Sequence, residues 1–370
     1  MLKGFSALSQ QYWDELIGVN PAAQRLDHRQ SGAQSRRTLL AVEAQAQQAR
    51  LAGEAAKQQF IEFTQAHLHE QVADEVLRKL ANIEQVSSSL FELGEAFFQL
   101  LDRLSSPSVT LNALDPLVHQ IDWLQQDLLK LVNQPQYRNR TKSGALIKDI
   151  KTGLRFLGLE TLQSVVPVYG LRRSLPHSTD PFIALKMRIW DHSLATALAA
   201  RKLAEQSAEL PYAAFCIGLY HSLGHMAVCR NYLRTYQQVR QGELLKARNE
   251  RHYELTDALD NLTADGSFLS SLLQEFAAIL SADLTARWGL KRLALCQTLD
   301  LLAEDEMQFS QAPLSQLVRQ AQVYVQTTKL WQQQKLSSEE RLSWLQQAEL
   351  STEQCLLLDS TDLSRLAADS

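Results

Sequence analysis

The sequence predicts an all-α fold, and three observations support this prediction. Apolar residues recur every three or four positions along most of the 370 residues and seldom alternate, which is the period of a helix and not of a strand. Leu, Ala, Gln and Glu dominate the composition, and all four favour helices. Gly and Pro, which interrupt helices, occur only 14 and 9 times.

The N-terminal region, residues 1–76, is expected to be a helical extension. Residues from about 36 to 83 are rich in Ala, Gln and charge, and they predict one long helix with a stripe made of Val72, Val76, Leu80 and Ile83. Before Phe60 the apolar face is thin, so this part of the helix needs a partner surface. A coiled-coil contact is an alternative, although no heptad pattern is sustained.

Helix boundaries in the middle of the chain can be predicted from Pro, Gly and capping residues. Asp115-Pro116 predicts a helix start, with Asp as N-cap and Pro in the first turn. One apolar face then runs from Leu117 to Leu131, and Asn133-Gln134-Pro135 ends the helix. Ile147 to Leu157 marks the next helix, and Gly158 is its expected C′ residue.

Two later helices each carry a histidine on their apolar face. Asp180-Pro181 predicts the start of a helix that contains His192, and a second helix from Ala214 to Val228 contains His221. Residues 240–266 are more polar and predict a loop-rich excursion.

The tail beyond about residue 305 predicts further helices. Ser337 with Glu340, and Ser351 with Gln354, have the spacing of capping boxes.

Composition and charge exclude several classes of function. The net charge of −4 gives no basic stripe for a phosphate backbone, so we expect no nucleic-acid partner. No apolar run is long enough to cross a bilayer, so we expect no membrane contact. The four cysteines are far apart without a Cys-x-x-Cys pair, and the first residues lack the apolar core of a signal peptide. These features predict a cytoplasmic protein.

Several short motifs occur in a fixed order between residues 77 and 293. They comprise Asp115-Pro116, then Asn133 and Tyr137, then Leu157-Gly158, then Trp190 with His192-Ser193, then Ala214–Gly224 with Gly218, His221, Ser222 and Gly224, and finally Ala282–Leu290 with Trp288. In this order they resemble the HDOD family, the catalytically degenerate relatives of HD phosphohydrolases in bacterial signalling. The resemblance implies an HD-like helical bundle at 77–293, followed by a C-terminal helical addition at 294–370.

The resemblance also implies a vestigial metal site at His192, His221 and Ser222. His192 and His221 match metal ligands of the active relatives, but Ser222 stands where those relatives have an aspartate. A hydroxyl brings no negative charge to a divalent cation. Tyr220 also stands where a small aliphatic residue is usual, and a His-His pair after the late Trp motif is absent. We therefore expect no catalytic residue, no bound metal and no cofactor.

Other interpretations of the histidines remain open. His192 and His221 could be hydrogen-bonded core residues, or Asp191 or Asp283 could supply a carboxylate near His192. His221 and His225 are four residues apart, as in zinc proteases, but that chemistry needs a glutamate where Ser222 stands.

The sequence therefore predicts a non-enzymatic, bacterial signal-transduction module that binds a protein partner of a signalling pathway or a small ligand. A residual metal-dependent phosphohydrolase using His192 and His221 is one alternative, and a structural helical adaptor is another. A homodimer through the terminal helices is a further open possibility.

Overall fold

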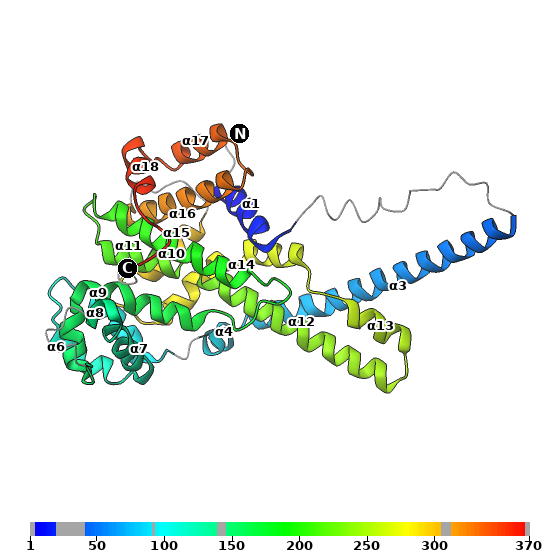
Figure 1. The fold of residues 1–370 in the computed structure, drawn as a ribbon, viewed down its shortest axis with the longest axis horizontal. Coiled ribbons are helices and arrows are strands. Elements are labelled where there is room, and N and C mark those ends of the chain that lie inside the picture. Colours follow the sequence, from blue (N-terminus) through cyan, green and yellow to red (C-terminus); the bar gives the residue numbers. More distant parts are fainter. Residues whose placement is uncertain (1–3, 20–40, 91–92, 139–145, 305–311, 367–370) are drawn as a thin grey trace.

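The computed structural model describes residues 4–19, 41–90, 93–138, 146–304 and 312–366, and over these residues the fold is all-α, as predicted. Figure 1 shows a helical body from which one long helix projects. The helices are α1 (Phe5–Ile17), α3 (Ala41–Leu80), α4 (Ile83–Leu90), α5 (Glu95–Leu104), α6 (Leu111–Val118), α7 (Asp122–Val132), α8 (Pro135–Arg138), α9 (Ile150–Ser174), α10 (Leu185–Ala204), α11 (Pro211–Tyr220), α12 (Leu223–Asn249), α13 (Tyr253–Asn261), α14 (Gly266–Ala286), α15 (Leu295–Ala303), α16 (Pro313–Gln332), α17 (Ser338–Gln347) and α18 (Thr352–Asp359).

One hydrophobic core joins helices from both ends of the chain. α10 packs against α11 and α16, and α12 packs against α14 and the second half of α3. α1 lies against α10, α14 and α16, so the first described helix and a helix more than 300 residues later are neighbours (Figure 1). No helix in the described part of the chain is long and apolar enough to cross a membrane.

Both Asp-Pro predictions were wrong about where helices begin. α6 begins at Leu111 with Thr110 as its N-cap, so Asp115 and Pro116 lie inside it. The expected apolar face from residue 117 to 131 is split, because α6 ends at Val118 and α7 begins at Asp122. Pro116 is tolerated because it comes late in a helix of two turns, where it removes a single backbone donor.

The second Asp-Pro pair lies in the turn before α10. Asp180-Pro181 is a cis peptide, and the Thr179 hydroxyl donates a 2.7 Å hydrogen bond to the Phe182 carbonyl. α10 begins only at Leu185. An Asp-Pro pair favours a turn as much as a helix start, which explains the error.

The predicted loop at residues 240–266 is mostly helical. α12 continues to Asn249, and α13 follows after a short turn. The polar residues lie on exposed faces, while Leu244, Ala247 and Leu259 are buried. Polarity alone therefore misled the prediction, since a thin apolar face was enough to fix the helices.

Other predicted boundaries are confirmed. Asn133 caps the end of α7, and its amide nitrogen donates to the carbonyls of Leu129 and Ile147 at 2.7 and 2.8 Å. Both capping boxes form, at Ser337 and at Ser351. Gly158 has a φ of 76° and breaks α9 into two helical parts.

Candidate functional site

His192 of α10 and His221 at the end of α11 meet in the core. Their Nε2 atoms are 3.0 Å apart. The Nδ1 of His221 lies 2.7 Å from the Gly218 carbonyl oxygen, which can only accept, so this nitrogen carries the proton. In the neutral pair the Nε2 of His221 is then the acceptor, and the Nε2 of His192 is the donor. The Nδ1 of His192 is left as a buried acceptor, for which the described residues provide no hydrogen-bond partner.

The hydroxyl of Ser222, next to His221, is hydrogen-bonded to Ser193. Ser193 of α10 donates a 2.7 Å hydrogen bond to the Ile189 carbonyl and forms a short hydrogen bond with Ser222. Since Ser193 uses its proton on Ile189, Ser222 is the donor to Ser193. Ser222 therefore stabilises the contact between α10 and the start of α12.

The chain breaks between α11 and α12 at the histidine, where one continuous helix over residues 214–228 was expected. Ser281 of α14 holds this junction. Its Oγ accepts a 2.8 Å hydrogen bond from the Gly224 N–H and lies 2.7 Å from the His221 carbonyl oxygen. His221 and His225 consequently lie in different helices, so the expectation of two histidines on adjacent turns of one helix was wrong.

Helix α1 covers this histidine cluster, defined here as His192, His221 and His225. The ring of Trp13 stacks on His225, with centroids 4.1 Å apart, and packs edge-on against His192. Tyr12 also contacts His192, with a centroid distance of 4.8 Å. The residues facing the cluster thus include two aromatic side chains that the sequence analysis did not consider.

Polar contacts fix the end of α1 on the body. Arg188 of α10 donates to the carbonyls of Glu15 and Leu16, and Ser270 of α14 donates a short hydrogen bond to Asp14. The carbonyls of Glu15 and Leu16 are among those that a helix leaves unpaired at its C-terminus. The spacing of Phe5, Leu8, Tyr12, Trp13 and Leu16 could have predicted an amphipathic helix, but it does not indicate which surface that helix covers.

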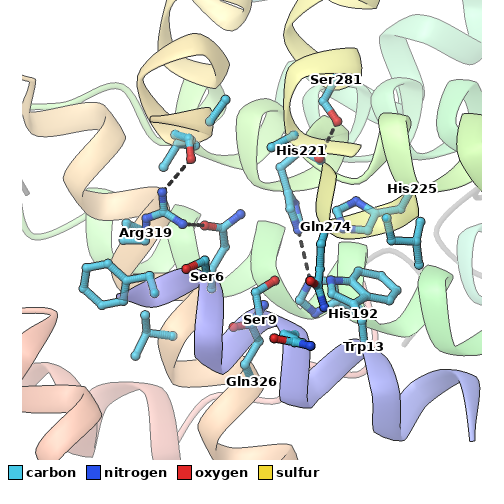
Figure 2. Close-up of a pocket in the computed structure, with 18 of the residues that line it drawn as sticks. Ser6, Ser9, Trp13, His192, His221, His225, Gln274, Ser281, Arg319 and Gln326 are labelled. Atoms are coloured by element: carbon cyan, nitrogen blue, oxygen red, sulfur yellow. Dashed lines mark hydrogen bonds between the residues drawn. The ribbon is translucent and has the colours of Figure 1, made fainter. Parts of the chain in front are cut away.

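A cavity of about 310 Å³ lies between α1, α14, α16 and the histidine cluster. Figure 2 shows Ser6 and Ser9 of α1, Gln274 of α14, and Arg319 and Gln326 of α16 around it. The Arg319 guanidinium donates to the Leu302 carbonyl at 2.5 Å and lies over the Phe5 ring. Apolar side chains such as Leu273 and Val323 make up most of the lining, and polar groups interrupt it. Among the described lining residues Arg319 carries the one charged group, on the side away from the histidines.

Burial keeps all three histidines neutral. It lowers the pKa of His221 to about 4, although the hydrogen bond to Gly218 opposes this shift. Burial also lowers the pKa of His192 well below its usual value, and the neighbouring His221 and His225 add to the effect. The pKa of His225 falls well below its usual value for the same reason, burial first and His221 second.

The remaining motif residues hold the helices around the cluster. A Cβ on Gly218 would lie 2.8 Å from the Ala197 Cα, so glycine allows the close approach of α11 to α10. Trp288 packs edge-on against Tyr220, whose hydroxyl donates to the Pro167 carbonyl at 2.9 Å. Tyr137 is buried in α8, and Trp190 is half-buried on α10.

A divalent metal does not fit the donors at this position. Asp191 and Asp283 are both exposed, whereas the three histidines are buried. Neither carboxylate therefore joins the histidines as a buried metal ligand. Asp191 instead lines a second cavity of about 500 Å³, beside Arg188 and Lys329. Across the described residues no group of three or more His, Cys, Asp and Glu side chains is arranged to hold a metal ion. The Nε2 of His221 is already hydrogen-bonded to His192, and an uncharged serine stands where hard cations need a carboxylate.

Comparison with known proteins places these features in a family. The family model for the HDOD domain matches residues 90–292, which is more than half of the chain. An uncharacterized protein of Treponema pallidum (strain Nichols) is 26% identical over 163 residues, which cover 44% of this chain and 29% of that protein. The chain thus spans less than a third of the length of that relative.

Solved structures of similar shape have low sequence identity. A protein of Shewanella amazonensis SB2B, provisionally named a phosphohydrolase, is 19% identical with a TM-score of 0.47, over 77% of this chain and 94% of that one. An HDOD domain protein of unknown function from Geobacter sulfurreducens is 16% identical with a TM-score of 0.46, over 78% and 94%.

Proposed function

Because the chain belongs to the HDOD family, we propose that it is a signal-transduction module that binds a partner protein or a small ligand and does not hydrolyse phosphoesters. The observation that carries this proposal is the stacking of Trp13 on His225, beside the paired His192 and His221. A hydrolytic site must leave its ligands open to a substrate, whereas here the chain's own helix α1 covers the histidines and leaves a cavity of only about 310 Å³ beside them.

The cavity beside the histidine cluster supports a binding role. Its volume of about 310 Å³ is at the small end of the range for ligand pockets. Gln274, Gln326 and the serines of α1 can donate and accept hydrogen bonds, and the unpaired Nδ1 of His192 can accept one. A small polar ligand could occupy this space, and a partner protein could bind by replacing α1.

Hydrolysis assays separate a lost reaction from a blocked one. We expect the wild-type chain, Trp13→Ala and His221→Ala to hydrolyse phosphodiester and nucleotide substrates at the same background rate with Mn²⁺, Mg²⁺ or Fe²⁺. Trp13→Ala is the decisive variant, because it removes the aromatic cover and leaves the histidines in place. Turnover by wild type or Trp13→Ala that disappears on adding His221→Ala would instead support a metal-dependent phosphohydrolase using His192 and His221.

Native mass spectrometry tests ligand binding in the cavity. We expect the full chain to retain a small polar molecule that Ser9→Trp loses, because an indole at position 9 would fill the space. Gln332→Trp, at the end of α16 and outside the residues that line this cavity, is the matched control and should keep the ligand. Equal occupancy in all three proteins would mean that the molecule binds outside this cavity. If none of the three proteins carries a ligand, binding of a small molecule is ruled out and binding of a partner protein is the remaining form of the proposal.

A further inference from the structure

Helix α3 extends far beyond the body that it belongs to. Its 40 residues correspond to about 60 Å of helix at 1.5 Å per residue. In Figure 1 its first half projects away from all other helices, while its second half lies along α12 and α13.

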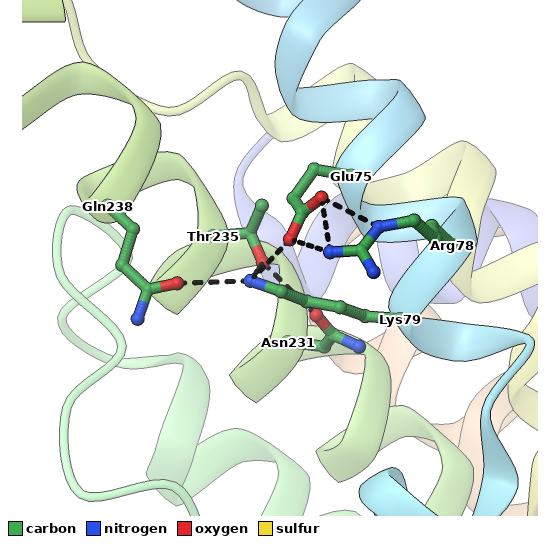
Figure 3. Close-up of polar contacts among 6 residues, drawn as sticks. All are labelled: Glu75, Arg78, Lys79, Asn231, Thr235 and Gln238. Carbon is green, nitrogen blue, oxygen red and sulfur yellow. Dashed lines mark hydrogen bonds and ion pairs between the residues drawn. The ribbon is translucent and has the colours of Figure 1, made fainter. Parts of the chain in front are cut away.

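The second half of α3 is fixed to the body by apolar and polar contacts. Val72, Val76 and Leu80 are buried. Lys79 donates to Thr235 and Gln238 of α12, both at 3.0 Å (Figure 3). Lys79 also lies 3.3 Å from Glu75, which pairs with Arg78. The direction of the projecting half is therefore determined by a well-anchored base.

The projecting part, residues 48–61 and called the arm here, carries an apolar stripe that the described residues leave exposed. The stripe has small residues followed by large ones at spacings of three or four: Ala49, Ala52, Gly53, Ala56, Phe60 and, just beyond the arm, Phe63. All are exposed, and Phe63 is 72% exposed. An isolated helix as short as the arm is only marginally stable in water. A partner packed on the apolar stripe would stabilise it.

A groove lies directly beside the two phenylalanines. It has a volume of about 720 Å³ and is open to solvent along the base of α3. It is called the arm groove here. Its walls are formed by Phe60, Phe63 and His67 of α3, by Glu243 of α12 and by Tyr253, Glu254 and Leu255 of α13.

We infer that the chain forms a homodimer in which two α3 helices pair antiparallel and the small residues of each arm lie in the arm groove of the other copy. The midpoint between the small stripe, residues 49–56, and the Phe60–Phe63 pair falls close to Ala56. A twofold axis at that point places each Ala/Gly stripe opposite the phenylalanines of the other copy. Small against large is the packing that lets two helices approach closely, and a twofold contact uses the same surface on both copies.

Charge favours this occupant and this orientation. Leu68 lies on the flank of α3 that faces α12 and α13, where it lines the arm groove. Arg50 comes 18 residues, or five full turns, earlier and therefore lies on the same flank. A twofold axis across an antiparallel pair brings like flanks together. Arg50 of one copy, which pairs with Glu54 of its own helix, therefore arrives beside Glu254 of the arm groove. Glu243, which pairs with Lys246, is the other acidic residue among the described side chains that line this groove. A parallel pair would instead place Arg50 of each copy level with Arg50 of the other, about 15 Å along the helix from Phe60 and the groove.

Light scattering of the full chain tests the dimer. We expect a mass of twice 41.8 kDa, and a dimer dissociation constant raised at least about 100-fold by Phe63→Glu, since symmetry removes two aromatic anchors at once. Leu51→Glu is the matched control, because Leu51 is 50% exposed on the opposite side of the same arm and should leave the dimer intact. A wild-type chain that stays monomeric, or a Phe63→Glu chain that still dimerises, would overturn the proposal; a monomer would leave the arm groove to a helix of another protein.

Two further variants test the orientation. Arg50→Glu should weaken the dimer about tenfold, and adding Glu254→Arg should restore it. Under oxidation Ala56→Cys should form an intermolecular disulfide, whereas Ala49→Cys should not, because its two copies are about 20 Å apart in the antiparallel pair and a disulfide needs Cα atoms within about 7 Å. Cross-linking through Ala49→Cys would show a parallel pair and contradict the inference.

Discussion

Replacing Gly224 by alanine is expected to lower the free energy of unfolding by about 3 kcal/mol or more. A Cβ at this position would lie 1.8 Å from the carbonyl oxygen of Ala277 and 2.7 Å from its carbonyl carbon. These are backbone atoms of α14, so no side-chain rotation can relieve the contact. The helices α12 and α14 must separate, which also breaks the hydrogen bond from the Gly224 N–H to Ser281. Urea unfolding followed by circular dichroism measures the loss.

Gly242→Ala is the control for this substitution. Gly242 lies on the same helix, is exposed, and has no atom within 4 Å of an added Cβ. Alanine there should be neutral or stabilise the protein by up to about 1 kcal/mol, because it favours helix more than glycine does. Similar midpoints for the two variants would mean that α12 and α14 are not in close contact.

Features set by local sequence could be predicted well. The helical period predicted the fold class, and the caps at Asn133, Ser337 and Ser351 predicted where helices begin or end. Each of these depends on residues within a few positions of one another. The inward orientation of His192 and His221 was likewise evident from the face of the helix that carries them.

Features set by distant residues could not be predicted. The break between His221 and Ser222 depends on a hydroxyl of α14, some 60 residues later. The cover over the histidine cluster depends on Trp13, which is nearly 180 residues from His192. Neither contact leaves a periodic signal in the sequence, because each joins one side chain to a distant surface. Asp115 and Asp180 show the opposite failure, in which a local signal favoured a boundary that tertiary packing moved.

The stability of the protein is expected to fall steeply as the pH decreases below about 6.5. The three buried histidines have folded-state pKa values below the usual value of 6.5, so they take up protons on unfolding in this range. For a group whose folded pKa is lowered, protonation favours the unfolded chain, and stability is complete only above the unfolded pKa. Each histidine contributes about 1.4 kcal/mol per pH unit, and together they reach about 4 kcal/mol per pH unit.

A variant that keeps the packing but removes one titrating ring isolates this effect from that of the carboxylates. His225→Phe preserves an aromatic ring against Trp13 and should reduce the slope of the unfolding free energy against pH by about 1.4 kcal/mol per unit. Urea unfolding at pH 7.5, 6.0 and 5.0 gives both slopes. Equal slopes for wild type and His225→Phe would mean that His225 is already protonated in the folded protein, and the Trp13 ring would then stack on a cation instead of a neutral imidazole.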